Sequence, residues 1–313
     1  MAVFATATNM ANVVLHNKDA NRETALKLYS GEVIKAFRER NIFKELISVR
    51  TLTGGKSSQW IVTGEADETA IQTHKRGDEV NVNELPNTEI TISIGDRLVY
   101  SHFSDKLDEI IAQYDLRSEI VFQASQVLST KLDKAIVALL KDKAGHDAHA
   151  LATGDLIKTS VSLPVAGYGA EPTAQGKGDK LVEALFATRS NRQDRNISEE
   201  PNVIVSPTEY YNVVQSTRGT NSDYTNGNGG IDSGKVRQIA GFSLGWSNNV
   251  KENDTDKTLA IVFDKQAVGM VSAMDLTSEA NYVPSRLGDL LVTYMAYGLG
   301  FLNTARITIL KDA

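Results

Sequence analysis

The chain has 313 residues, of which 41% are hydrophobic, so it can bury a sizeable core, which we expect in two lobes. It contains no cysteine, which excludes disulfides and thiolate metal sites, and its net charge of −6 argues against coating nucleic acid with its whole surface. There is no leader pattern at residues 1–8, and the longest apolar run, 290–302, is too short for a membrane span, so we expect a soluble cytoplasmic protein.

Residues 1–45 divide into an arm and a helix. Residues 1–17 are polar, small and without pattern, which predicts an arm that is ordered only against another surface. From residue 21 to residue 45 apolar side chains recur at helical spacing, with Gly31 among them. We therefore expect a short helix with a break or kink at Gly31.

Residues 50–103 favour β-structure. A short apolar strand is expected at 60–62, and around residues 90–94 isoleucine alternates with polar residues. Between these strands, residues 64–87 are charged and polar, which predicts a long projecting hairpin, about 50 Å from root to tip at the rise of a β-strand. Such a hairpin is marginally stable alone and needs a neighbour to lie on.

Residues 104–145 carry the longest helical pattern, with apolar residues spaced alternately by three and four. Ser104 can cap the first turn, and acidic residues follow it where the helix dipole is positive. Gly145 can supply a left-handed stop after Lys141 and Lys143. A continuous helix of this length would extend about 55–60 Å and serve as a beam for the rest of the chain.

The remaining chain predicts a lobe in which strands and helices are mixed. Ser206, Pro207 and Glu209 form a capping-box helix start directly after a buried strand at 203–205. A strand that feeds directly into a helix indicates an α+β fold. The other expected elements are a strand at 156–165, a glycine-rich bend, a helix at 179–189, a mobile loop at 218–234, strands at 239–246, 259–263 and 269–272, an acidic turn at 251–257, and a buried closing element at 290–302 and 305–310.

One motif matches a catalytic pattern. Gly241-Phe242-Ser243-Leu244-Gly245 has the spacing of the nucleophile elbow of serine hydrolases. That chemistry requires the serine on a tight turn between a strand and a helix, and a histidine base later in the chain. No helical pattern follows Ser243, and the last of the five histidines is His149. We therefore expect Ser243 on an ordinary strand, with a serine hydrolase as a remote alternative.

Three other motifs match binding patterns incompletely. Gly54-Gly55-Lys56-Ser57 is similar to the end of a phosphate-binding loop but lacks its first glycine, so a turn is expected there. His146 and His149 have the spacing of a metal site without a third ligand, and we expect a solvated helix end. Asp254 and Asp256 lack the other features of a calcium loop. The sequence thus predicts no catalytic, cofactor-binding or metal-binding residues.

The order of these parts resembles the major capsid protein of tailed bacteriophages, the Hong Kong ninety-seven fold. The local sequence is similar to the T-seven group of short-tailed phages from about residue 21 to residue 310, and departs from it at 218–234 and 251–257. The segments that carry this similarity are Ser30-Gly31-Glu32-Val33 with Ala36-Phe37, Gly55-Lys56-Ser57, Tyr114-Asp115-Leu116-Arg117-Ser118-Glu119, Gly241-Phe242, Ala267-Val268-Gly269 and Tyr294-Met295-Ala296-Tyr297-Gly298.

The resemblance implies a division into that family's domains. These are an N-terminal arm with a short helix at 1–49, an E-loop hairpin at 50–103, a peripheral domain at 104–175 and 275–313 with the spine helix 104–145, and an axial domain at 176–274. It also implies that the E-loop and the arm lie across neighbouring subunits. Contacts between subunits are therefore expected at Trp60, Thr69, Ile71, Lys75, Arg76, Asp115, Arg117 and Glu119.

The same resemblance implies a structural role without enzymatic activity, cofactor or membrane. Pentamers and hexamers would form an icosahedral shell around double-stranded DNA, which is enclosed without sequence-specific binding. A procapsid would assemble in the bacterial host cytoplasm on a scaffolding protein, with a portal protein at one vertex, and would expand into the virion capsid as DNA enters. No helical pro-region precedes residue 21, so we expect the scaffold to be a separate chain.

The nearest alternative is an encapsulin, a cellular nanocompartment shell of the same fold that holds cargo enzymes instead of DNA. Neighbouring genes would distinguish the two, since a phage gene is expected beside genes for a portal and a scaffold. Some relatives cross-link their shells through a lysine and an asparagine. Lys56 and Lys75 are candidate lysines, but the T-seven group does not resemble that chemistry and no cross-link is expected.

Overall fold

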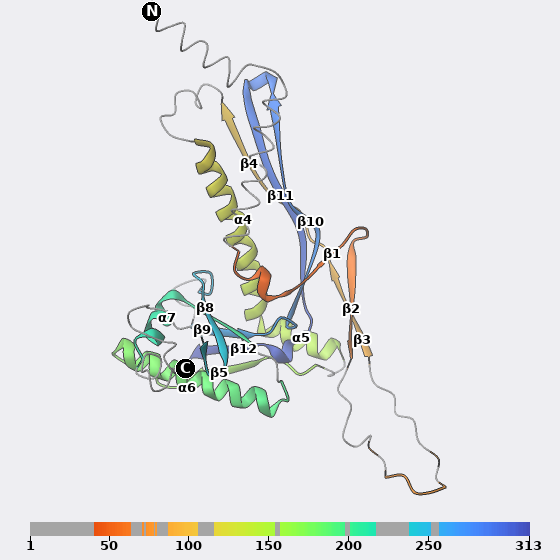
Figure 1. Cartoon of the computed structure of the whole chain (residues 1–313), viewed down its shortest axis with the longest axis vertical. Helices are drawn as coiled ribbons and strands as arrows, with labels where there is room; N and C mark the ends of the chain where they lie inside the picture. The colour runs from red at the N-terminus through yellow and green to blue at the C-terminus, as the bar shows by residue number, and fades with distance from the viewer. Residues whose placement is uncertain are drawn as a thin grey trace, which may run out of the picture. The chain divides into compact units, whose positions relative to one another are not determined.

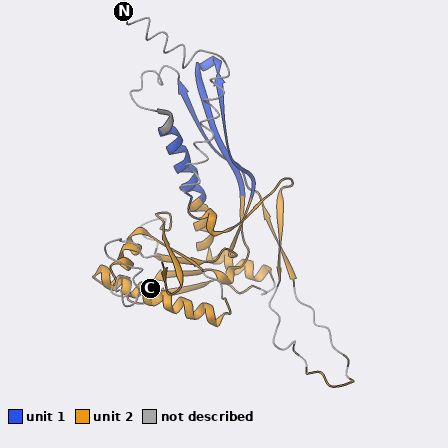
Figure 2. Cartoon of the chain, in the orientation of Figure 1, with its two compact units in different colours: residues 1–41, 95–132, 272–297 blue, residues 42–94, 133–271, 298–313 orange. Residues whose placement is uncertain are grey.

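The structure is a computed structural model that describes residues 41–63, 71, 73–77, 79, 87–105, 116–153, 157–197, 201–216, 238–251 and 257–313. The predicted arm, nearly all of the predicted helix at 21–45, the loop 218–234 and the centre of the acidic turn lie outside these residues. The chain divides into two compact units (Figure 2). Unit 1 comprises residues 1–41, 95–132 and 272–297, and unit 2 comprises residues 42–94, 133–271 and 298–313.

Among the described elements, strands β1 to β4 precede α4, and helices and strands are mixed after it (Figure 1). The elements described are η2 Lys44–Leu46, β1 Ser48–Thr51, β2 Ser57–Thr63, β3 Asn87–Ser93, β4 Leu98–Asp105, α4 Leu116–Lys141, α5 Lys143–Ala152, β5 Val161–Val165, α6 Ala174–Asp194, β6 Asn202–Val205, α7 Pro207–Val214, β7 Gln238–Ile239, β8 Phe242–Trp246, β9 Thr258–Phe263, β10 Val268–Val283, η4 Pro284–Arg286, β11 Gly288–Phe301, η5 Thr304–Arg306 and β12 Thr308–Asp312. Within these residues no helix is long and apolar enough to cross a bilayer.

Unit 2 contains a six-stranded sheet with the order β5-β12-β9-β6-β8-β7. The sheet is mixed, because β12 runs parallel to β5 and β6 runs parallel to β8, while β9 is antiparallel to both β12 and β6. Helices α6 and α7 bring Leu181, Leu185 and Val213 into one buried cluster with Val203 of β6 and Val262 of β9. This α+β lobe, the sheet with α6 and α7, therefore has a core of its own.

The predicted helix start after β6 is confirmed in part. Pro207 is the first residue of α7, and the Ser206 hydroxyl accepts a hydrogen bond from the Glu209 amide (3.4 Å). Glu209 does not complete a capping box, because its buried carboxylate accepts hydrogen bonds from the Tyr168 hydroxyl and from Asn212 Nδ2 (3.1 Å). A buried carboxylate needs partners, and here tertiary partners replace the local one.

The predicted hairpin is confirmed, since β2 and β3 form a two-stranded antiparallel sheet. Residues alternate between partly buried and exposed along both strands, so the hairpin has an inner and an outer face. On the inner face, Trp60 and Ile90 pack against a buried cluster of Ile92, Val271 and Leu302. The inner face is therefore seated on β10 and on the residue after β11.

In unit 1, β4 pairs antiparallel with the first part of β11, from Asp105 opposite Gly288 to Leu98 opposite Met295. These strands belong to a four-stranded sheet with the order β1-β10-β11-β4. Helix α4 keeps the apolar spacing expected from the sequence, and within unit 1 its buried apolar residues are Ile120, Val121, Ala124, Leu128 and Leu132.

The predicted continuous helix at 104–145 is wrong at both ends. Ser104 lies in β4 opposite Asp289, so it caps no helix, because pairing with a distant strand outweighs the local cap signal. At the other end α4 stops at Lys141, and the Asp142 carboxylate caps α5 by accepting from the Gly145 amide (3.0 Å). Gly145 thus lies in the first turn of a second helix. The 26 described residues of α4 extend about 39 Å.

Several later elements also differ from the prediction. Residues 239–246 are not one strand, because Ala240 and Gly241 have φ angles of 53° and 78° and turn the chain between β7 and β8. Helix α6 begins earlier than expected, since the Thr173 hydroxyl accepts from the Gly176 amide. The strand predicted at 269–272 continues to Val283, the closing element is formed by strands β11 and β12 with η5 between them, and the strand at 156–165 is confined to β5.

Candidate assembly interface

The paired strands β2 and β3 form the root of the hairpin, and Trp60 anchors them. The guanidinium of Arg50 lies 3.6 Å from the centre of the indole ring, and Arg50 Nη1 donates to the Gln59 carbonyl (3.0 Å). The indole N–H is buried without a hydrogen-bond partner among the described residues. Packing and a cation–π contact, rather than a hydrogen bond, therefore fix Trp60 in place. Sequence analysis expected Trp60 at a contact with a neighbouring subunit, but Trp60 lies on the inner face of the hairpin, which packs against its own chain.

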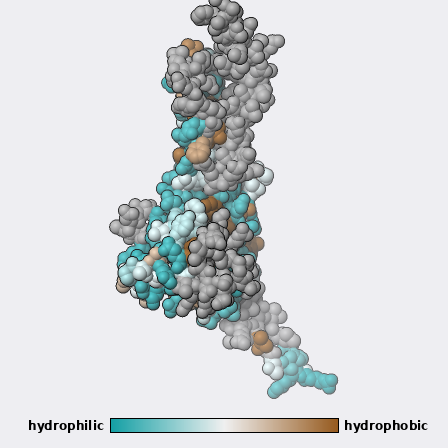
Figure 3. Space-filling view, turned by 60° about the vertical axis from the view of Figure 1, so that its left-hand side comes forward, coloured by the Kyte–Doolittle hydropathy of each residue, from teal (hydrophilic) through white to brown (hydrophobic). Residues whose placement is uncertain are grey.

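The outer face of the hairpin exposes apolar surface. Ile61, which lies opposite Glu89, is 78% exposed, and Ile71 in the connector between β2 and β3 is 80% exposed. Lys75 and Arg76 are also exposed, and the described tip of the connector is mostly hydrophilic, as seen at the lower end of Figure 3. A two-stranded ribbon with one seated face is marginal by itself, so it gains stability from any surface that covers the other face.

The predicted contacts on the long helix are only partly described. Asp115, the side chain of Arg117 and the connector residue Thr69 lie outside the described residues. Glu119 is exposed on α4, where its carboxylate accepts a hydrogen bond from Gln123 Nε2 (2.9 Å) one turn later. The structure thus brings Ile71, Lys75 and Arg76 together on one connector, and places Glu119 separately in unit 1.

Sequence analysis missed a buried ion cluster next to the hairpin root. Arg192 of α6 and Asp264 are each 1% exposed, and Arg192 Nη2 donates to both carboxylate oxygens (2.7 and 2.6 Å). Arg192 Nη1 donates to the Arg306 carbonyl (2.8 Å), while Arg306 Nη1 lies 3.1 Å from Asp264 Oδ2. Burial lowers the pKa of Arg192, and the charge of Asp264 opposes that shift. One carboxylate therefore joins α6, the turn after β9 and η5.

His146 and His149 are not at a solvated helix end, which corrects the prediction. His146 is fully buried, and its Nε2 lies 3.1 Å from the Leu139 carbonyl, which can only accept, so Nε2 carries the proton and Nδ1 accepts from the Ser160 hydroxyl (2.8 Å). Both rings pack on Phe301, with ring centres 4.8 and 5.7 Å away, and burial lowers both pKa values. In the described ranges no three His, Asp or Glu side chains are grouped to hold a metal ion.

Ser243 lies inside strand β8, opposite Asn202 of β6 and Gln238 of β7. The residues that follow β8 form a turn, so the serine is not at a strand-to-helix corner, as predicted. The phosphate-loop match also falls at a turn, where Gly55 has a φ angle of 94° directly before β2. Neither motif has the geometry that its chemistry requires.

The α+β lobe exposes three large aromatic side chains that sequence analysis did not identify. Phe186 of α6, Tyr211 of α7 and Trp246 of β8 have exposed fractions between 51% and 55%. Aromatic residues are enriched at protein interfaces, so these three are further candidates for subunit contacts. Their helical and strand patterns could not reveal them, because a pattern predicts which face is apolar but not which apolar residue stays uncovered.

Comparison with known proteins gives a consistent result over most of the chain. Residues 62–310 match the family described as Gp10A-like major capsid protein. The chain is 21% identical to the major capsid protein of Escherichia phage T7 over 311 residues, covering 89% of this chain and 88% of the relative. It is 20% identical to the major capsid protein of Enterobacteria phage T3 over 309 residues, with 89% and 88% covered. The solved capsid structure of the cyanophage P-SCSP1u is similar with a TM-score of 0.70 and 28% identity, covering 87% of this chain and 88% of that chain.

Proposed function

The chain belongs to the Gp10A-like family of major capsid proteins, and we propose that it assembles through pentamers and hexamers into an icosahedral shell around double-stranded DNA. Its α+β structure has the Hong Kong ninety-seven fold of phage capsids. The protein is a structural component of a bacteriophage virion that self-assembles into a capsid lattice. The domain boundaries, subunit contacts, assembly route and partners are part of this proposal.

The observation that carries the proposal is the hairpin. Its inner face is seated on its own chain through Trp60, while Ile61 on the outer face and Ile71 in the connector are largely exposed. A neighbouring subunit that covers this face would bury apolar area that no described residue of the same chain covers. Each Å² buried would stabilise the contact by roughly 25 cal/mol. Contacts repeated around a closed lattice hold each subunit at several places at once, so modest single contacts suffice.

The proposed domains are the arm at 1–49, the E-loop at 50–103, the peripheral domain at 104–175 and 275–313, and the axial domain at 176–274. In this division the exposed aromatic residues Phe186, Tyr211 and Trp246 all belong to the axial domain, which is proposed to form the pentamers and hexamers. Thr69, Ile71, Lys75, Arg76, Asp115, Arg117 and Glu119, with the hairpin root at Trp60, are the proposed contacts elsewhere.

Assembly is proposed to begin in the host cytoplasm as a procapsid on a separate scaffolding protein, with a portal protein at one vertex. Expansion during packaging would be a rigid-body switch between two packings of the same subunits. The acidic chain fits DNA that is enclosed without being bound tightly, because a net charge of −6 does not favour phosphate contacts over the whole surface.

Electron microscopy and sedimentation of the protein expressed alone, and together with its candidate scaffolding partner, test the proposal. Closed shells of uniform diameter support it, and dependence of that uniformity on the partner supports the phage assembly route. Small soluble oligomers under both conditions would overturn it. Shells that form alone and retain a cargo enzyme instead of nuclease-protected DNA would favour the encapsulin alternative. Ester hydrolysis that is lost in Ser243→Ala would favour the hydrolase alternative.

A further inference from the structure

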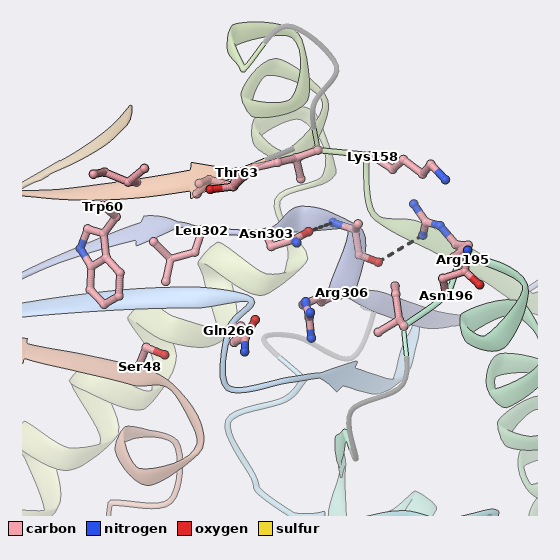
Figure 4. A pocket seen from close by; sticks show the side chains of 15 residues that line it. Ser48, Trp60, Thr63, Lys158, Arg195, Asn196, Gln266, Leu302, Asn303 and Arg306 are labelled. Atoms are coloured by element: carbon pink, nitrogen blue, oxygen red, sulfur yellow. Dashed lines mark hydrogen bonds between the residues drawn. The ribbon is translucent and has the colours of Figure 1, made fainter. Parts of the chain in front are cut away.

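A cavity of about 480 Å³ lies beside the hairpin root in unit 2 (Figure 4). One wall is the end of β2, residues 60–63, and another is formed by residues 195–197 after α6. Lys158 and Asn303 also line the cavity, and Ile157 and Leu302 give it an apolar side. Among the described lining residues there are three cationic side chains and no carboxylate. The described lining is therefore positively charged and partly apolar.

Arg195 is one of the cationic residues that line this cavity. Its guanidinium donates to the carbonyls of Thr159 (2.8 Å) and Ala305 (3.2 Å), which are neutral acceptors. Asp264 is already bound to Arg192 and Arg306, so it does not neutralise Arg195. Burial, and then repulsion by Arg192, lower the pKa of Arg195.

Lys158 adds a second positive charge at the cavity. It is exposed and forms no ion pair in the described part of the chain, and Figure 4 shows its side chain on the same side as Arg195. The side-chain amides of Asn196 and Asn303 add neutral polar groups, one of which is already used because Asn303 Oδ1 accepts from the Ala305 amide (3.1 Å). Two cations with amide donors beside an apolar wall suit a carboxylate on an aliphatic stem.

The sequence offers one segment with matching chemistry. The connector between β2 and β3, residues 64–86, has only Lys75 and Arg76 as basic residues, and its apolar residues include Val80, Val82 and Leu85. Its acidic residues number six and are Glu65, Asp67, Glu68, Asp78, Glu79 and Glu84. Residues 1–40, by contrast, contain six basic and four acidic residues, so charge favours the connector over the arm.

We propose that the acidic connector of a second copy of this chain inserts a carboxylate into the cavity between Lys158 and Arg195. The inference rests on the proposed assembly function and names the receiving site for one of its contacts. A second copy is favoured because every described connector residue, 71, 73–77 and 79, is exposed and so is not buried against its own chain. A phosphate backbone fits less well, since its charges form an open row whereas these cations lie at an apolar cavity.

Charge reversal is the first test. In the full chain assembled as above, Lys158→Glu is expected to reduce the yield of closed shells at least about tenfold, because it places like charges together at every copy of the contact. Lys134→Glu, at an exposed lysine of α4, makes the same change in net charge away from the cavity and is the control. Restoration of the yield by one acidic-to-lysine change in the connector, combined with Lys158→Glu, would identify the inserted residue.

Cysteine cross-linking is the second test, and the absence of native cysteine makes it clean. Lys158→Cys is combined in turn with cysteine at each acidic connector position, and assembled particles are oxidised and run on a non-reducing denaturing gel. Covalent dimers and longer chains from at least one pair are expected, and they should be absent from unassembled subunits.

The outcomes separate this proposal from the one on which it rests. If the unmodified chain forms no shells, the proposed function fails. If it forms shells, Lys158→Glu gives the same shell yield as Lys134→Glu, and no cysteine pair cross-links, then the cavity proposal alone is overturned. Cross-links that leave the chain monomeric would mean that its own connector fills the cavity, and a change in DNA retention without cross-links would mean that the cavity binds DNA. Either result overturns the proposal.

Discussion

The α+β lobe and the β2–β3 hairpin bury their apolar side chains in different ways. The lobe covers its six-stranded sheet with two helices and fully buries Leu181, Leu185, Val203 and Val262 within one chain. The hairpin has two strands, one seated face and an outer face that leaves Ile61 exposed. The lobe can therefore fold on its own contacts, whereas the hairpin completes its burial only when another surface covers it.

This difference teaches how a shell protein separates folding from assembly. The lobe has its own core before assembly, and a hairpin that is only partly buried keeps contact surface available for neighbours. The two tryptophans allow the regions to be followed separately, because Trp60 is in the hairpin and Trp246 is in the lobe. Unfolding and hydrogen exchange are measured on the unassembled subunit.

The largest effect is expected from Asp264→Asn in the lobe. It leaves Arg192 and Arg306 without their shared carboxylate, and because Arg192 and Asp264 are 1% exposed, the loss should be about 3–5 kcal/mol. Urea unfolding followed by Trp246 fluorescence in a Trp60→Phe background measures it. Glu183→Gln, which breaks an exposed pair with Lys180, is the control and should change little. Equal urea midpoints for Asp264→Asn and Glu183→Gln would show that the buried ion cluster does not stabilise the lobe.

A pH-dependent effect is expected at Asp133 of α4, which is 2% exposed. Burial raises its pKa from 3.8 to about 6, although hydrogen bonds from the backbones of Ile42 and Phe43 and the side chain of Asn249 oppose this shift. The neutral acid is therefore favoured in the folded chain, so its contribution to stability is complete below pH 3.8 and is lost as the pH rises through about 6.

Asp133→Asn should consequently stabilise unit 2 at pH 8 by up to about 3 kcal/mol, since each pKa unit corresponds to about 1.4 kcal/mol. Near pH 4 the variant and the unmodified chain should be equally stable. Urea unfolding at both pH values, with the same Trp246 signal, checks this. A difference that does not depend on pH would show that packing, and not ionisation of Asp133, determines the effect.

The hairpin should respond to Trp60→Ala by opening locally. The change removes the ring that packs on Ile92, Val271 and Leu302 and that contacts Arg50, so the free energy of hairpin opening should fall by about 2 kcal/mol. Hydrogen exchange of the β2 and β3 amides measures this, while Trp246 should report an unchanged lobe.

Trp60→Phe is the matched variant for that experiment. It keeps an aromatic ring at the hairpin root and removes the indole N–H that has no partner among the described residues, so exchange should stay close to that of the unmodified chain. Equal exchange in the Ala and Phe variants would mean that the ring does not anchor the hairpin.

Local signals made much of this fold predictable from the sequence. The alternation around Ile90 and Ile92 identified the inner face of the hairpin, and Ser206 with Pro207 marked the start of α7. Such features depend on residues within one turn or one strand. The order of these local parts was also what made the resemblance to phage capsid proteins apparent.

The errors arose where distant segments decide the structure. Ser104 has the chemistry of a helix cap, but its pairing with Asp289 of β11 cannot be seen in the local pattern. Glu209 has the spacing of a capping box, but its carboxylate is bound by residues far along the chain. Sequence analysis did not single out Arg195, because nothing nearby in sequence indicates the cavity that it lines.

The smallest effect on subunit stability, and the sharpest contrast, is expected from one substitution on the two faces of the hairpin. Ile61→Thr keeps a β-branched residue on the exposed face, so stability should change by no more than about 0.5 kcal/mol. Ile92→Thr places the same hydroxyl at a 3% exposed position and should open the hairpin in hydrogen exchange.

In assembly, the exposed position should become the sensitive one. Ile61→Thr should lower the yield of closed shells while leaving subunit exchange unchanged, because its cost appears only when a neighbour covers the outer face. Sedimentation of assembly reactions at matched subunit concentration measures the yield. If Ile61→Thr assembled as well as the unmodified chain, the outer face at Ile61 would be free in the shell, and the incomplete burial of the hairpin would have to be relieved elsewhere along the connector.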